Sequence, residues 1–169
     1  LSSEPSDFCK GVNMKLSPSY VNRLKYTSGY ILIDCGCALT DPVITAIESS
    51  DIIFTVNDVN ILSLKRAKVS LNVIQQLNQK DKARLIINKN MKKNSVTIND
   101  FENLLGIPAY AVISSDFKTV NSSLNNGQPV TTYKPRSPIA RDIVDLVDKM
   151  VTEREGSVET PKKAKRFNG

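Results

Sequence analysis

The 169-residue sequence contains no histidine and only three cysteines, Cys9, Cys35 and Cys37. Without histidine the chain cannot build a Ser-His-Asp or Cys-His catalytic arrangement, because imidazole is the general base of such sites. An odd number of cysteines, two of them one residue apart, does not suggest a disulfide framework. With no histidine or further cysteine nearby, these residues do not suggest a zinc or redox site either. The cysteine usage instead fits a reducing, cytoplasmic compartment.

Long apolar runs and glycine-rich loops are also missing. No run reaches membrane-spanning length, and the first residues are too polar for a signal peptide. Residues 10–15 end on a lysine like a phosphate loop, but they contain one glycine, and Leu16 follows where such a loop has Ser or Thr. Several glycines are needed for backbone N–H groups to approach phosphates. The chain opens on Leu1 rather than Met, which predicts a fragment, a processed product or a partly observed chain.

The positive charge is concentrated at one end of the chain. The net charge is +6, and four basic residues fall within the last nine positions: Lys162, Lys163, Lys165 and Arg166. We predict that residues 152–169 form a basic, disordered tail, because a run of like charges is usually a solvated segment. Binding of a membrane surface or a nucleic acid through this tail is the less favoured alternative, so the predicted location is cytoplasmic, with peripheral membrane attachment left open.

Residues 30–34 read Tyr-Ile-Leu-Ile-Asp and lie between Gly29 and Gly36. An unbroken apolar run bounded by glycines predicts a strand buried on both faces, as in the interior of a parallel sheet. Ligands of such sheets bind at the carboxyl ends of the strands, where Asp34 would lie. Two interpretations remain: a Walker B strand whose Asp holds Mg²⁺, or a carboxylate that caps the turn after a core strand.

The rest of the chain alternates between predicted strands and helices. Further strands are expected at residues 52–56, 83–87 and 109–113. Helices are expected after Ser17, after Thr40, over residues 61–77, after Thr97, after Ser115 and Asp116, and after Ser137. This order predicts an α/β fold with a mainly parallel sheet and helices on both faces. We assign residues 1–16 to an irregular lead-in and residues 17–151 to the α/β domain.

Polar residues follow three of the predicted strands. They are Asp34, then Asn57 with Asp58, then Asn88. Because parallel strands end at the same edge of a sheet, these side chains are expected to gather there. Packing of an apolar sheet does not require polar groups at its edge. The sequence therefore predicts a ligand site at the carboxyl edge.

Residues 29–149 resemble the MinD/ParA family of deviant Walker ATPases, in particular the CpaE/TadZ branch that places pilus assembly machinery. The resemblance is carried by an ordered set of short motifs. These are residues 30–34 as Walker B, 51–58, 63–67, 85–89 as the strand that ends in Asn, 104–108, 126–129 and 137–140. They cover about the second half of the family's ATPase domain. The resemblance implies an incomplete P-loop NTPase-like fold that binds ATP and Mg²⁺.

The resemblance also implies roles for individual residues. Asp34 would help to hold Mg²⁺, and the Gly36 N–H would contact a terminal phosphate. Asn88 would hydrogen-bond the adenine edge, since its amide is both donor and acceptor. Asp116 would lie in the next loop that passes the base. Implied partners are a second copy of the chain, dimerised around nucleotide, and pilus-assembly or other envelope proteins.

Two departures from the family pattern limit the expected activity. The signature phosphate loop with two lysines is missing, and Ala38 stands where relatives often have glycine. The chain by itself is therefore not expected to hydrolyse ATP, but it would do so if a preceding half supplied the loop. The alternatives are a non-hydrolysing binding module of the same fold, or a surface binder that acts through the basic tail.

Overall fold

The computed structural model describes residues 18–26, 28–36, 38–91 and 96–157. The predicted lead-in, two of the three cysteines (Cys9 and Cys37) and the basic residues at positions 162–166 lie outside the described residues. Within them, no helix is both long and apolar enough to cross a membrane.

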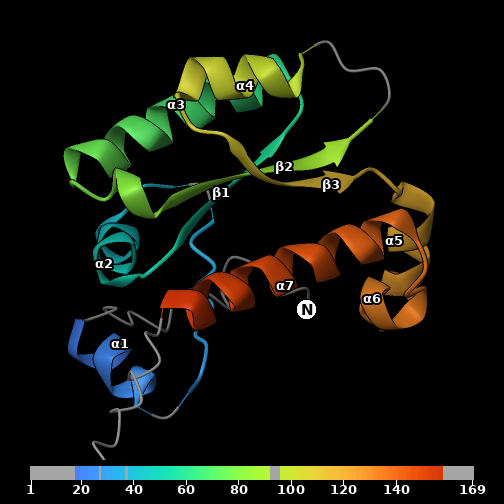
Figure 1. Cartoon of the computed structure of the whole chain (residues 1–169), viewed down its shortest axis with the longest axis horizontal. Helices are drawn as coiled ribbons and strands as arrows, with labels where there is room; N and C mark the ends of the chain where they lie inside the picture. Colours follow the sequence, from blue (N-terminus) through green and yellow to red (C-terminus); the bar gives the residue numbers. More distant parts are fainter. Residues whose placement is uncertain (1–17, 27, 37, 92–95, 158–169) are drawn as a thin grey trace, which may run out of the picture. The chain divides into compact units, whose positions relative to one another are not determined.

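Helices and strands alternate along most of the chain (Figure 1). The predicted helices and the last three predicted strands are confirmed to within a few residues, and the short helix α6 was not predicted. The elements are α1 (Pro18–Lys25), α2 (Asp41–Ser49), β1 (Ile53–Asp58), α3 (Ile61–Gln76), the 3₁₀ helix η2 (Lys80–Lys82), β2 (Ala83–Asn90), α4 (Ile98–Leu105), β3 (Ala109–Ser114), α5 (Phe117–Asn125), α6 (Val130–Tyr133) and α7 (Pro138–Ser157).

The described strands form one sheet in the order β1-β2-β3. Strands β2 and β3 are parallel, with Leu85 beside Ala109 and Ile87 beside Val112. Helices α4 and α7 both pack against β3, and Figure 1 shows them on opposite sides of the sheet. The predicted α/β fold, with a parallel sheet and helices on both faces, is therefore confirmed.

The predicted strand at residues 30–34 is wrong. In the structure this segment forms neither helix nor strand, and the side chain of Leu32 is 85% exposed. A strand is stable only when its backbone N–H and C=O groups pair with a neighbouring strand. The sheet that the described residues form contains β1, β2 and β3 but not this segment. Asp34 therefore follows an irregular segment rather than a core strand.

The chain divides into two compact units. The first comprises Leu1–Phe54 and Val69–Ala83, and the second comprises Thr55–Lys68 and Arg84–Gly169. In the first unit α1 packs against α2, and its buried side chains include Val21, Ala46, Ile47, Leu71 and Ile74. The second unit holds nearly all of the sheet, and its fully buried large side chains are Leu85, Ile87 and Phe101.

Local sequence signals set several element ends in the second unit. The Thr97 side chain accepts a hydrogen bond from the Asp100 backbone N–H, and Asp100 accepts one from the Thr97 N–H, which is the predicted capping box. Helix α4 ends at Gly106, whose φ of 65° suits glycine. Helix α7 continues to Ser157, so the predicted start of the tail at residue 152 falls inside this helix. The domain boundaries themselves stay predictions.

Candidate functional site at the carboxyl edge of the sheet

Three strands of the second unit end on polar residues at one edge of the sheet. Strand β1 ends at Asp58, β2 at Asn90 and β3 at Ser114. The Lys89 Nζ and the Asp58 Oδ2 are 2.9 Å apart, which joins the ends of β1 and β2. Both side chains are substantially exposed, so solvent screening keeps this ion pair weak. Of the residues predicted to gather here, Asp58 lies at the edge, whereas Lys89, Asn90 and Ser114 were not among those predicted.

The end of β2 departs from regular strand geometry. Lys89 has a φ of 51°, in the left-handed region that a non-glycine residue rarely adopts. The register between β2 and β3 also shifts between Ile87 and Asn90. Beyond this irregularity the ends of the two strands are joined by a backbone hydrogen bond, which the Ser115 N–H donates to the Asn90 carbonyl at 2.9 Å. The shift positions Asn90, rather than Lys89, beside Ser114 at the edge.

A shallow pocket of about 500 Å³ lies at the ends of β2 and β3. Its size is in the range of small-molecule sites. The lining combines an amide, two hydroxyls and a carboxylate with two apolar side chains: Asn90, Met91, Ser114, Ser115, Asp116 and Pro138. Pro138 begins α7 and Asp116 precedes α5, so two helix N-termini border the pocket. Such an arrangement can hydrogen-bond a polar ring and contact its faces.

Asp116 is the predicted site residue that lies in this pocket. Its carboxylate Oδ1 accepts a hydrogen bond from the Thr119 N–H at 3.0 Å and caps α5. This bonding to Thr119 lowers the pKa of Asp116, with smaller contributions from the nearby ammonium groups of Lys134 and Lys118. The group is therefore a carboxylate at neutral pH. A carboxylate can accept about four hydrogen bonds, so capping leaves acceptor capacity for a ligand.

Asn88 does not line the pocket. It lies within β2, two residues before the strand ends, and is half-buried. Asn90, Ser114 and Ser115 line the pocket instead, and sequence reasoning missed all three as site residues. The alternating pattern of a strand could have placed Asn90 on the same side as Asn88, but the irregular end of β2 could not be read from the sequence.

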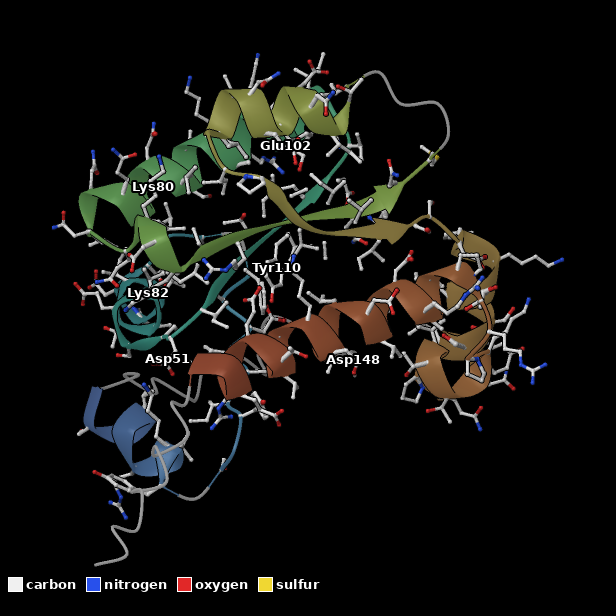
Figure 2. The ribbon with its side chains drawn as sticks, viewed as in Figure 1. Asp51, Lys80, Lys82, Glu102, Tyr110 and Asp148 are labelled. Atoms are coloured by element: carbon white, nitrogen blue, oxygen red, sulfur yellow. The ribbon has the colours of Figure 1, made fainter. Side chains whose placement is uncertain are left out.

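The position of α7 beside the pocket is fixed by a side chain of the helix itself. The Asp142 Oδ2 accepts a hydrogen bond from the Ser114 N–H at 2.8 Å. Further along, the Lys149 Nζ lies 4.0 Å from the centre of the Tyr110 ring, and the Tyr110 hydroxyl is 3.1 Å from the Glu153 Oε2. Figure 2 shows Tyr110 in the layer between the sheet and α7. These contacts hold the helix against the length of β3.

Asp34 and Gly36 belong to the first unit, where they form a short local turn. The Asp34 Oδ1 accepts a hydrogen bond from the Gly36 N–H at 3.1 Å. Gly36 has a φ of 61°, which glycine adopts without strain. The intervening Cys35 is half-buried, and burial, followed by the charge of Asp34, raises the pKa of its thiol. The N–H that was predicted to contact a phosphate is thus bound by the residue that was predicted to hold the metal.

Several solved structures have the same fold. The cell division ATPase MinD of Pyrococcus furiosus matches with a TM-score of 0.73 and 22% identity, over 90% of this chain and 63% of that chain. A ParA family ATPase from Chlorobium tepidum TLS matches with a TM-score of 0.70 and 23% identity, over 76% of this chain and 53% of that chain.

A third solved structure was determined with nucleotide. It is the septum site-determining protein MinD of Pyrococcus horikoshii OT3, complexed with Mg-ADP. It matches with a TM-score of 0.71 and 21% identity, over 94% of this chain and 65% of that chain.

The chain has a MinD/ParA fold. No protein-family model and no curated protein matches the sequence. The chain spans less than two thirds of the length of the MinD and ParA structures. The predicted MinD/ParA resemblance is thus confirmed at the level of the fold, whereas the CpaE/TadZ branch stays a prediction.

Proposed function

We propose that this chain is the base-binding part of a MinD/ParA-like ATPase, and that the pocket beside Asp116 holds the base of an adenine nucleotide. The observation that carries the proposal is a polar pocket at the carboxyl edge of a parallel sheet, the usual ligand position in α/β folds. The Asp116 carboxylate would accept from the exocyclic amine of adenine. The Asn90 amide would supply both a donor and an acceptor.

A separate proposal concerns Mg²⁺ at Asp34, which belongs to the first unit. Mg²⁺ in nucleotide sites is commonly held by one or two protein carboxylates together with phosphates and water. Among the described residues no group of three or more His, Cys, Asp or Glu side chains could hold a metal without such help. Asp34 is exposed and its turn is fixed by the Gly36 N–H, so it could act as a single carboxylate ligand. The bound metal would neutralise phosphate charge.

The wider role that we propose is nucleotide-dependent positioning of pilus or other cell-envelope machinery by a homodimer. It is supported by the fold shared with the MinD and ParA structures and by the family motifs at residues 85–89 and 126–129. Hydrolysis would require a phosphate loop that this sequence does not contain. In a protein with such a preceding half, ATP and Mg²⁺ should promote dimerisation, which sedimentation can measure.

Titration of ¹⁵N-labelled chain with adenosine, ATP and guanosine tests the pocket assignment. We expect adenosine and ATP to shift the amide signals of Asn90, Ser115 and residues around Asp116. Asn90→Ala should weaken adenosine binding by about 1–3 kcal/mol, the value of a lost hydrogen-bonding pair. Asp116→Asn should also weaken it, while Asp145→Asn, an exposed position on α7, is the matched control.

Asn88→Ala is compared directly with Asn90→Ala in the same titration. The family resemblance predicts the larger loss at Asn88, and the pocket geometry predicts it at Asn90. Signals that respond only outside the pocket, or equal binding by wild type, Asn90→Ala and Asp116→Asn, would refute base binding at this site.

A non-hydrolysing module of the same fold is the second candidate. The missing glycine-rich loop favours it. An ATPase assay on the longest natural form of the protein distinguishes the two candidates. Steady ATP hydrolysis that is lost in Asp34→Ala supports the ATPase. Partner binding without hydrolysis supports the non-hydrolysing module.

A further inference from the structure

Helix α5 presents its polar side to the protein and large apolar side chains to solvent. Its buried residues are Thr119 and Ser123. Phe117 and Leu124 are 81% and 71% exposed. They are seven residues apart, so they lie on the same side of the helix. A helix at the surface of a globular protein normally buries its apolar side, and exposed apolar patches mark interaction sites.

The segment that follows Asp116, the N-cap of α5, carries only positive charge up to residue 141. Residues 117–141 include four basic side chains and no acidic one. All four are exposed: Lys118, Lys134, Arg136 and Arg141. Lys118 and Lys134 both lower the pKa of Asp116, so both ammonium groups lie near this carboxylate at the start of α5. The Asp116 carboxylate itself is engaged by the Thr119 N–H.

Helix α6 extends this surface. It packs against both α5 and α7, and Figure 1 shows α5 and α6 side by side. Tyr133, at the end of α6, adds a partly exposed aromatic ring. We call the exposed side chains of Phe117, Leu124, Tyr133, Lys118 and Lys134 the α5–α6 patch.

We propose that the α5–α6 patch binds the surface of an anionic lipid bilayer. Its basic groups complement the charge of anionic headgroups, and Phe117 and Leu124 can enter the boundary between headgroups and acyl chains. A nucleic acid also carries negative charge, but its backbone is contacted by charged and polar side chains. Contact with phosphates would leave Leu124 exposed. The combination of exposed Phe and Leu side chains with positively charged neighbours therefore favours a lipid surface over a nucleic acid.

This proposal is independent of the nucleotide assignment and of the basic tail. It rests on residues 117–134 and requires neither a bound base nor Lys162 to Arg166. A chain that fails to bind adenosine can still bind vesicles through the patch.

Vesicle co-sedimentation of the full chain tests the proposal. The probes are vesicles of phosphatidylcholine alone and of phosphatidylcholine mixed with phosphatidylglycerol, at low and moderate salt, with duplex DNA in a parallel assay. We expect binding to the mixed vesicles only. Phe117→Gln with Leu124→Gln should weaken it by about tenfold or more, because two apolar side chains no longer leave water. Lys118→Gln with Lys134→Gln should weaken it by about tenfold.

Two controls make the result specific to the patch. Val144→Gln with Val147→Gln removes two exposed valines from α7 and should leave vesicle binding unchanged. A chain with Lys162, Lys163, Lys165 and Arg166 all changed to Gln should keep most of its binding. Circular dichroism melting verifies that each variant is folded.

Several outcomes would overturn the proposal. These are no binding to anionic vesicles, equal binding by wild type and the Phe117/Leu124 variant, loss only when the tail is neutralised, or binding to DNA without binding to vesicles.

Discussion

Two stretches of this chain have nearly the same residues but different structures. Ile31, Leu32 and Ile33 precede Asp34, and Leu85, Ile86 and Ile87 precede Asn88. The second stretch is the centre of β2, where the side chains of Leu85 and Ile87 are 0% exposed. The first stretch is irregular, with Leu32 85% exposed.

The difference lies in the neighbours and not in the residues themselves. Strand β2 lies between β1 and β3, so its backbone groups can pair on both sides. Residues 30–34 have no place in that sheet. An apolar run thus favours a buried strand. It forms one only where adjacent strands pair with its backbone and helices cover its side chains. Four changes would test this comparison, in order of decreasing effect.

Leu85→Ala and Leu32→Ala form the most direct test. Leu85→Ala should lower the free energy of unfolding by about 2–5 kcal/mol, the cost of a cavity in a packed core. Leu32→Ala should change it by less than about 0.5 kcal/mol, as at other exposed positions. Urea denaturation followed by circular dichroism measures both. A comparable loss at Leu32 would mean that residues 30–34 are buried after all, as the sequence predicted.

Asp142→Ala tests how helix α7 holds the edge strand. Removal of the carboxylate leaves the Ser114 N–H without its acceptor, which should cost about 1–3 kcal/mol. Asp145→Ala, an exposed change three residues along the same helix, should be nearly neutral. If the two variants unfold at the same denaturant concentration, the bond to Ser114 adds nothing to the free energy of unfolding.

Thr97→Ala and Thr40→Ala compare two helix N-caps, one with a side-chain capping hydrogen bond and one without. Both threonines are N-caps, but Thr97 accepts from the Asp100 N–H whereas Thr40 makes no side-chain capping bond. Thr97→Ala should cost about 1 kcal/mol, a typical value for a lost cap. Thr40→Ala should cost less, and thermal melting of the pair shows the difference. Equal melting temperatures would indicate that the capping box of α4 adds no stability.

The smallest expected effect on stability is that of protonating the two capping carboxylates with acid. Hydrogen bonds from Thr97 lower the pKa of Asp100, and hydrogen bonds from Thr119 lower that of Asp116. A lowered folded-state pKa means that the stabilisation is complete above the ordinary Asp value of about 3.9 and is lost as the pH falls through the lowered value.

Melting temperatures measured from pH 6 down to strongly acidic pH test this expectation. The wild type should lose stability mainly below about pH 4, where aspartate begins to protonate. An Asp100→Asn, Asp116→Asn double variant should be less stable near neutral pH, and its acid-dependent loss should be smaller. A double variant with the same acid dependence as the wild type would contradict a role for these two groups.

Elements whose signals are local could be predicted from the amino-acid sequence. A capping pair at Thr97 and Asp100, a left-handed Gly106 and the aliphatic run of β2 each act within a few residues, so the pattern predicts helix α4 and strand β2 correctly. The α/β fold followed from their alternation. Asp116, which the family resemblance placed near the base, lies in the pocket, and its role stays a prediction.

The conformation of residues 30–34 and the set of residues that line the pocket depend on tertiary contacts. Whether an apolar run is buried depends on strands distant in the sequence, which no local pattern encodes. Asn90 reaches the pocket because Lys89 takes a left-handed conformation and the β2–β3 register shifts before the strand ends. Ser114 and Ser115 join it because β3 is parallel to β2, so that both strands end at the same edge. These relations depend on backbone pairing between segments about 25 residues apart, so they arise only when the sheet forms.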